Sequence, residues 1–491
     1  MNTLLIYPEY PDTFWGFKHA LRFILKKANV PPLGLLTVAA LLPKDWTLRL
    51  VDLNLKKLKE KDIAWADMVL ISAMDAQRPS VQRIVDLCQK YRVRTVAGGP
   101  LFSANPQDFP GIDHLVLKEA EITLPLFLAD LEKGQPQHIY TTDQWADLSK
   151  SPRPMWELAD IKKYSSMNLQ YSRGCPYNCD FCDISILYGR IPRTKSTRQV
   201  LGELEALHKM GWRGGVFIVD DNFVGNKARL KAEVLPQMVA WMDVHKHPFT
   251  FITQASIEMA DDDDLLSLMA RAGFDQVFVG IETPDENSLQ ECSKFQNKNR
   301  DMIAGVKKIQ GCGIQVHAGF IVGFDSDPKS IFDTQIKFIQ QSGIATAMVS
   351  LLNILPKTKL YWRLKDQDRL TKEFSGDNTD FNLNFVPKMG PVPLLEGYRK
   401  IVKTIYSPRN YYRRVRTFLR EYRPVKVQKP RFSFSRLAAF ASSIVVLGLW
   451  SKERFQYWGL VFWTLFKRPR LFPTAITMTI YGYHFRKVFH C

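Results

Sequence analysis

Short apolar runs alternate with longer amphipathic stretches along the first 360 residues of the chain. The first series of runs lies at Thr3–Tyr7, Thr47–Leu53, Met68–Ser72, Val93–Ala97 and His114–Leu117, with helix-like stretches such as 34–42 between them. Apolar runs of this length that alternate with helical patterns are typical of βαβ units and parallel sheets. The pattern predicts a doubly wound α/β domain over residues 1–140, whose ligand crevice lies at the carboxyl ends of the strands.

A second series of six runs follows a polar, proline-containing linker at 141–164. The runs lie at Met167–Ser172, Val216–Asp220, Phe249–Thr253, Gln276–Ile281, Gln315–Val322 and Met348–Asn353. Six strands alternating with helices predict a partial (β/α)6 barrel over residues 165–365. The chemistry of such barrels lies at the carboxyl ends of the strands. The overall fold class is therefore α/β, with a Rossmann-like domain followed by a barrel.

Residues 366–491 have a different pattern and predict a mainly helical C-terminal domain. Residues 391–491 carry 20 Lys and Arg against 3 Asp and Glu, whereas the whole chain has a net charge of +18. Such a basic segment indicates an anionic surface, which could be a lipid membrane, a nucleic acid or an acidic partner. Arg409–Arg436 is followed by the apolar runs Leu437–Trp450, Tyr457–Phe466 and Leu471–Tyr481.

The length and composition of these apolar runs favour a membrane surface. The first run has 14 residues, and a bilayer span takes about 20. Tryptophan-containing apolar helices flanked by Lys and Arg suit the membrane interface. Core helices with a solvated basic face are the alternative. A binding site for single-stranded nucleic acid would interleave basic and aromatic residues, so we expect no nucleic-acid partner.

The amino-terminal and cysteine patterns indicate an intracellular protein. The first apolar run is short and follows no basic region, so we expect a strand and not a secretion signal. The seven cysteines show no disulfide-like spacing, and an exposed thiolate site needs a reducing compartment. We expect a cytoplasmic protein that associates peripherally with the inner face of the membrane.

Three cysteines, Cys175, Cys179 and Cys182, form a C-x3-C-x2-C loop directly after the first barrel strand. Three thiolates this close can hold three irons of a [4Fe–4S] cluster. The fourth iron would then remain open to a substrate or cofactor. A zinc site would normally need a fourth Cys or His, and the loop has none. A structural metal knuckle, or three unrelated buried thiols, is the alternative interpretation.

This loop resembles the signature loop of the radical S-adenosylmethionine (SAM) superfamily, in which the open iron binds SAM and a 5′-deoxyadenosyl radical is formed. The resemblance implies that the backbone of Phe181 faces the adenine. It also implies SAM contacts at the ends of four later barrel strands. These candidates are Asp220, Asp221, Gln254, Glu282, Gly319 and Gly323. Taken singly, each of these runs is a weak signal, because an Asp pair after a strand is usually a helix cap.

The amino-terminal domain resembles cobalamin-binding domains. Ser72, Gly98 and Gly99 take the places of the turns that cradle the corrin and its nucleotide tail. The Asp-x-His-x-x-Gly motif that supplies a histidine to cobalt is absent from the first loop, which would leave cobalt without that ligand. A fold that no longer binds a corrin is the alternative.

The whole chain resembles the cobalamin-binding radical SAM proteins that include the hopanoid C-2 methylases. The resemblance includes Pro31–Ala40, Gly98–Phe102, Ser172–Pro176, Val219–Phe223, Gly319–Asp325, Ser342–Met348 and Tyr481–Arg486. Two departures stand out. Gln254 lies where many relatives have an acid, and Lys357 replaces a more usual glycine before Thr358.

The resemblance implies a cobalamin-dependent radical SAM methyltransferase that places a methyl group on an unactivated carbon of a membrane lipid, with a hopanoid-like polycyclic triterpenoid favoured. It implies a [4Fe–4S] cluster, SAM and cobalamin as cofactors, and an electron donor such as flavodoxin or ferredoxin. One alternative forms a ring or carbon–carbon bond in lipid chains without methyl transfer. A tRNA-modifying methylthiotransferase would place further cluster cysteines in the amino-terminal domain, which has only Cys88. A membrane- or nucleic-acid-docked sensor without turnover is the alternative from another class.

Overall fold

The computed structural model describes residues 1–491 except 372–375, 377–380, 426–433 and 491. The parts of the predicted C-terminal domain at those positions lie outside the described residues. The amino-terminal domain contains a parallel six-stranded sheet of order β2-β1-β3-β4-β5-β6. Its strands are β1 Asn2–Tyr7, β2 Thr47–Asp52, β3 Met68–Ser72, β4 Arg94–Gly98, β5 His114–Val116 and β6 Ile139–Tyr140. β6 is one strand more than the pattern predicts, because two residues are too short to form a recognisable apolar run.

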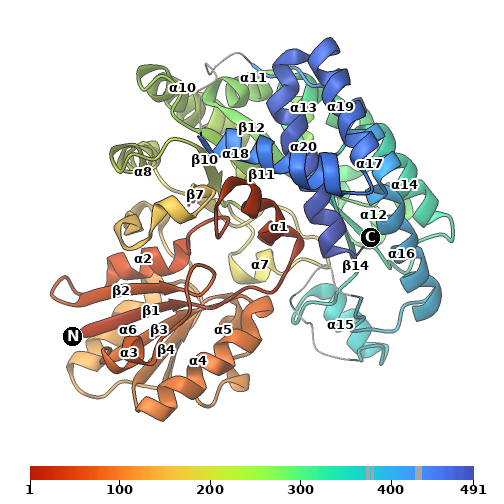
Figure 1. The fold of residues 1–491 in the computed structure, drawn as a ribbon. Coiled ribbons are helices and arrows are strands. Elements are labelled where there is room, and N and C mark those ends of the chain that lie inside the picture. The colour runs from red at the N-terminus through yellow and green to blue at the C-terminus, as the bar shows by residue number, and fades with distance from the viewer. Residues whose placement is uncertain (372–375, 377–380, 426–433, 491) are drawn as a thin grey trace.

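Helices cover both faces of this sheet, as a doubly wound fold requires (Figure 1). One face packs against α2 (Leu33–Leu41) and α6 (Ala120–Glu132). The other packs against α3 (Glu60–Ala64), α4 (Arg78–Tyr91) and α5 (Pro100–Ala104). Alternate residues of β1 pack on opposite faces of the sheet. Leu5 packs in the core under α2 and α6, and Leu4 and Ile6 pack in the core on the other face.

The second sheet forms the predicted partial barrel, with six parallel strands in the order β14-β13-β12-β11-β10-β7. Its strands are β7 Ser166–Leu169, β10 Gly215–Ile218, β11 Thr250–Gln254, β12 Phe274–Glu282, β13 Gln315–Val322 and β14 Thr346–Leu351. Helices α8 Thr197–Lys209, α10 Leu235–Val244, α11 Asp263–Ala272, α13 Met302–Gly311 and α14 Ile331–Ser342 pack around the outside. β7 and β14 are the two edges of this sheet, so the barrel is open along one side.

The first barrel run is not one strand, as the sequence pattern predicts, but two. β7 ends at Leu169, and Ser172–Arg173 forms a separate strand, β8, which pairs antiparallel with β9 (Arg193–Thr194). The amides of Tyr171 and Ser172 donate to the carboxylate of Asp220, at 2.8 Å each. These bonds turn the chain out of the sheet just before the cysteine loop.

The C-terminal region is helical, as predicted. Its helices are α16 Pro391–Tyr406, α17 Pro408–Glu421, α18 Phe434–Ser443, a π-helical segment at Ile444–Trp450, α19 Arg454–Lys467 and α20 Phe472–Val488. None of the helices in the described ranges is both long enough and apolar enough to cross a bilayer.

Helix α20 packs beside the amino-terminal segment that carries α1 (Lys18–Leu21), although the two lie at opposite ends of the sequence (Figure 1). Phe14 stacks on Phe485 with ring centroids 4.2 Å apart, and the Phe14 carbonyl lies 2.9 Å from Nε2 of His484. Gln315, the first residue of β13, donates to the sulfur of Met478. The two termini therefore meet near the amino-terminal ends of the barrel strands.

The linker predicted at 141–164 is packed between both α/β units. Trp156 is fully buried, and the amide of Met155 donates to the carbonyl of Leu36 in α2. The hydroxyl of Tyr164 donates to Asp52 at 2.7 Å. These contacts hold the amino-terminal sheet against the barrel despite the polar composition of the linker.

Candidate functional site

The cysteine loop begins at a glycine that no other residue could replace without strain. Gly174 has φ +93°, and a Cβ there would lie 2.9 to 3.0 Å from the carbonyl oxygens of Tyr188, Gly189 and Ile191. The amide of Cys175 donates to the Gly189 carbonyl. This close approach of two backbones orients the loop before its first cysteine.

The three loop cysteines are free thiols, half-buried and close enough to influence one another. The charge of Cys179 raises the pKa of both Cys175 and Cys182, after burial, which is the larger cause. Burial disfavours the thiolates more strongly than the nearby Lys294 favours them, whereas a bound metal would stabilise them. The donor set and its convergence therefore fit a cluster held by three thiolates.

Two carboxylates at the end of β10 hold the strand that leads into this loop. Asp220 is fully buried and accepts bonds from Tyr171 and from both the amide and the hydroxyl of Ser172. Asp221 accepts from the amide of Gly174 at 3.1 Å. Burial raises the pKa of Asp220 to about 7 and that of Asp221 to about 6, against these hydrogen bonds. The observed contacts position the loop, and a SAM contact for this pair stays a prediction.

Glu282 lies at the barrel mouth in a strained backbone conformation. It has φ +62° and is 8% exposed. Its carboxylate occupies space that only a glycine leaves open, because a Cβ at Gly280 would lie 2.3 Å from Oε1. A Cβ at Gly319 would lie 3.9 Å from the other carboxylate oxygen. Strain of this kind is often found where a side chain must be aimed at a ligand.

A buried lysine that sequence reasoning missed joins Glu282 to the cysteine loop. Nζ of Lys294 lies 2.9 Å from Oε1 of Glu282 and 6.0 Å from the ring centroid of Phe181. Burial opposes its charge, but Glu282, Cys179 and Cys182 raise the pKa of Lys294 well above its usual value. Lys294 is therefore a cation beside the thiolates. An isolated lysine in a loop gave no signal in the sequence.

The remaining predicted SAM residues lie around the same mouth. Gln254 is the last residue of β11 and pairs in register with Phe278 of β12. A Cβ at Gly319 would lie 2.9 Å from the Phe278 ring. Gly323 has φ +118° and lies beyond the end of β13, where its amide donates to Asp327. Phe181 packs near Phe324, with ring centroids 6.1 Å apart.

The predicted cobalamin residues lie together at the carboxyl edge of the first sheet. β3 and β4 are neighbours, and Ser72 pairs in register with Gly98. Gly99 has φ +96°, and a Cβ there would lie 2.7 Å from Oγ of Ser72. A Cβ at Gly98 would lie 2.5 Å from the carbonyl oxygen of Val116, so both glycines allow neighbouring segments of the chain to approach closely. A contact between these residues and a corrin stays a prediction.

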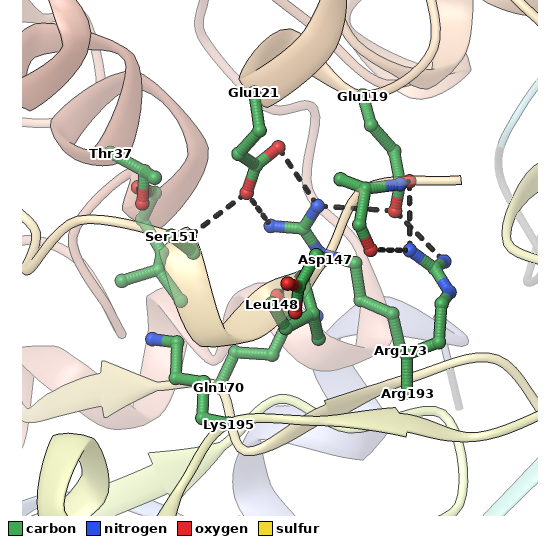
Figure 2. A network of polar contacts seen from close by, with 12 residues as sticks. Thr37, Glu119, Glu121, Asp147, Leu148, Ser151, Gln170, Arg173, Arg193 and Lys195 are labelled. Carbon is green, nitrogen blue, oxygen red and sulfur yellow. Dashed lines mark hydrogen bonds and ion pairs between the residues drawn. The ribbon is translucent and has the colours of Figure 1, made fainter. Parts of the chain in front are cut away.

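This edge of the sheet faces the cysteine loop. The charge of Asp75, three residues after Ser72, raises the pKa of Asp183, the residue that follows Cys182, although burial is the larger cause. Figure 2 shows the stronger link, in which Arg173 of β8 donates to Glu121 at 2.7 and 3.0 Å and to Glu119 at 3.2 Å. Arg193 of β9 also binds Glu119, at 2.8 and 2.9 Å. The sequence pattern alone did not predict these pairs.

Comparison with known proteins gives three family matches along the chain. Residues 169–339 match the radical SAM superfamily, residues 26–128 match the B12 binding domain, and residues 358–491 match a domain of unknown function. An uncharacterized methyltransferase from Synechocystis is 39% identical over 99% of this chain and 91% of its own. The hopanoid C-2 methylase from Rhodopseudomonas palustris is 37% identical over 78% of this chain and 73% of its own.

The chain belongs to the cobalamin-dependent radical SAM methyltransferases. The fold agrees with solved structures of that kind at low identity. The cobalamin-dependent radical enzyme OxsB, with aqua-cobalamin bound, covers 100% of this chain and 80% of its own at a TM-score of 0.64 and 15% identity. The methyltransferase TsrM from Kitasatospora setae, with cobalamin and a [4Fe–4S] cluster bound, has a TM-score of 0.58 over 74% of this chain and 78% of its own, at 14% identity.

Membership confirms the predicted enzyme class and its cofactors: a [4Fe–4S] cluster, SAM and cobalamin. The methyltransferase also needs a reductant for its cluster. The residues predicted for the two cofactor sites lie on facing edges of the two α/β units.

Proposed function

We propose that this methyltransferase adds a methyl group to an unactivated carbon of a membrane lipid, and that a hopanoid-like polycyclic triterpenoid is its favoured substrate. The observation that carries the proposal is a set of half-buried apolar side chains inside the barrel, among polar ones. On β10, β11 and β12, strand residues that face the outer helices are buried, whereas most of the alternate residues, which face inward, are half-buried. The inward apolar residues are Phe217, Ile252, Phe278, Ile321 and Met348. Accessible apolar side chains inside a barrel suit an apolar ligand.

The amino-terminal segment adds an aromatic side chain to this interior. Trp15 lies edge-on to Phe278 at 5.3 Å, and its Nε1 donates to the sulfur of Met348. His317, buried on β13, lies 6.5 Å from the Trp15 ring. Neither nitrogen of His317 has a hydrogen-bond partner in the part of the chain that the structure describes. A largely apolar molecule with one hydroxyl would complement this surface. The 37% identity to a hopanoid C-2 methylase supports the same substrate class.

The C-terminal helices support a location at the inner face of the membrane. Phe455, Phe462 and Phe466, at i, i+7 and i+11 on one face of α19, are 74%, 52% and 82% exposed. Trp450, at the end of the adjacent π-helical segment, is 83% exposed. Lys452, Arg454, Lys467 and Arg470 are exposed around them. Each basic residue near an anionic leaflet contributes about 1 kcal/mol, so apolar insertion and charge act together.

The chemistry divides between cofactors and protein. When bound, the cluster, SAM and cobalamin supply hydrogen abstraction and the methyl group, which polar methyl transfer cannot deliver to an unactivated carbon. Cys175, Cys179 and Cys182 hold the cluster, while Glu282 and Lys294 present charge to the SAM side of the mouth. The apolar interior orients the substrate and excludes water. A flavodoxin- or ferredoxin-like donor would supply the electron.

The test is mass spectrometry of SAM products from the cluster-reconstituted enzyme, supplied with hydroxocobalamin, a reductant and a hopanoid. S-adenosylhomocysteine together with 5′-deoxyadenosine and a methylated hopanoid supports the proposal. 5′-Deoxyadenosine alone, without bound corrin, would favour ring or bond formation in a lipid chain. Flotation with anionic liposomes tests the membrane surface separately, with a Trp450→Ser/Phe466→Ser variant expected to float less than the parent enzyme.

A further inference from the structure

A cluster of two histidines and a glutamate lies on the outside of the barrel, away from the site above. Glu205 and His208 are one turn apart near the end of α8, and His245 follows the end of α10. One ligand atom from each of the three lies within 4.8 Å of the others, and all three residues are half-buried. Helices of a βαβ unit end near the amino-terminal ends of the next strands, so the cluster lies at the opposite end of the barrel from the cysteine loop.

The hydrogen bonds of His245 fix which of its nitrogens carries a proton. Nδ1 lies 2.9 Å from the carbonyl oxygen of Trp241. A carbonyl can only accept, so Nδ1 is the donor. In the neutral ring Nε2 then presents a lone pair, and it lies 3.2 Å from Oε2 of Glu205. Two acceptors at this distance need a cation between them, either a proton on Nε2 or a metal ion.

The third residue favours the metal ion. The ring of His208 stands edge-on to that of His245, with centroids 4.7 Å apart. A proton on Nε2 can join only His245 and Glu205, and a second imidazolium beside it would be repelled. A divalent cation uses all three donors at once. An orienting bond from the far nitrogen of a histidine to a carbonyl is also the usual support for a metal ligand.

The surroundings of the cluster hold its donors in place. The ring of Trp241 stacks on His245 at 4.1 Å, and its Nε1 donates to Glu205 at 3.3 Å. Lys209 lies 3.5 Å from Glu205, but it is 74% exposed and can turn into solvent. The carboxylate and one imidazole are thus aimed at each other before any ion binds.

From this geometry we propose that Glu205, His208 and His245 form a binding site for a divalent transition-metal ion, with zinc as the best match to two imidazoles and a carboxylate. The fourth position would be taken by water. The ion would join the ends of α8 and α10 and stabilise the barrel at the end opposite the chemistry. This inference does not depend on the proposed substrate.

The test measures zinc in tag-free enzyme whose cluster has been assembled, so that iron occupies the loop cysteines. After dialysis against buffered zinc, we expect about one zinc per chain and a higher thermal midpoint. Glu205→Gln and His245→Gln should lose the zinc and its stabilisation. His247→Gln is the matched control, because His247 also faces a carboxylate, Asp243, at 2.9 Å, without a third donor.

Two results would overturn the site. One is a parent enzyme that takes up no zinc, which would leave an imidazolium–carboxylate pair at this position. The other is equal zinc uptake by the parent enzyme and all three variants, which would place the ion elsewhere. Circular dichroism of each variant before dialysis shows whether a loss of zinc reflects a loss of fold.

Discussion

The ion network between Arg173 and Glu121 should be worth several kcal/mol, and replacing Glu121 by Gln tests this directly. Both side chains are largely buried, at 14% and 10% exposure. Burial alone would raise the pKa of Glu121, but Arg173 outweighs it and lowers the pKa from 4.5 to about 2. A shift of one pKa unit corresponds to about 1.4 kcal/mol. The pair therefore contributes roughly 3 kcal/mol to the free energy of unfolding at neutral pH. The loss measured when one partner of a buried pair is removed is similar, at about 3–5 kcal/mol.

The sign of the pH dependence follows from the lowered pKa. The unfolded chain binds the proton more readily than the folded chain between pH 4.5 and about 2. The contribution is therefore complete above pH 4.5 and is lost as the pH falls through that window. Glu121→Gln should remove this part of the acid sensitivity as well as the stability at pH 7.

Urea unfolding at pH 7, followed by circular dichroism and tryptophan fluorescence, measures the effect. Glu157→Gln is the control, because its pair with Arg153 is about half exposed and should contribute less than about 1 kcal/mol. The double change Glu121→Leu/Arg173→Met should be less damaging than Glu121→Gln, since it also removes the cation that would otherwise keep only the longer ion pair with Glu119, while Glu119 keeps Arg193. A Glu121→Gln variant within 1 kcal/mol of the parent enzyme would refute the reasoning.

Three further predictions concern the loop cysteines, Lys357 and His317. Changing Cys175, Cys179 and Cys182 together to Ala should leave a folded protein that forms neither the cluster chromophore nor 5′-deoxyadenosine; either product would contradict the assignment of the cysteines. Lys357 has φ +66°, a conformation that glycine adopts without strain. Lys357→Gly should therefore raise the free energy of unfolding in urea by about 0.5–1 kcal/mol. A loss of stability would contradict this prediction. Burial lowers the pKa of His317 to about 4, so the unfolded chain binds more protons than the folded chain between about pH 6.5 and 4, and the free energy of unfolding falls as the pH is lowered. His317→Gln should reduce the loss of stability between pH 7 and 5 by about 2 kcal/mol. An unchanged loss would show that His317 is not buried as a neutral ring.

The strands and the order of the two α/β units could be predicted because each strand is a compact apolar run. β3 and β13 were predicted residue for residue, since their ends coincide with polar or glycine residues. The pattern missed the break between β7 and β8, because the hydrogen bonds that cause it come from Asp220, about 50 residues later. Local pattern has no information on such a distant partner.

Contacts between residues far apart in the sequence also explain which site residues could not be predicted. The cysteine spacing and the glycine pair are local signals, and both lie where the sequence places them. Lys294 and His317 are single residues, and their roles depend on the side chains that they contact in the fold. Lys294 acquires its role from Glu282, which lies 12 residues earlier on another element, and His317 from Trp15, which lies about 300 residues away. The departure expected at Lys357 was visible in the sequence, and its positive φ is a conformation that glycine adopts without strain.

The contact between the two units explains why an arginine precedes the first cysteine. Polar interfaces between domains are mobile by default, yet two cofactors must share one mouth. The planar guanidinium of Arg173 binds both oxygens of Glu121 and reaches Glu119 as well. This fork fixes direction as well as distance, which a lysine could not do. Because Arg173 lies two residues before Cys175, this fork ties the segment that carries Glu119 and Glu121 directly to the start of the cysteine loop.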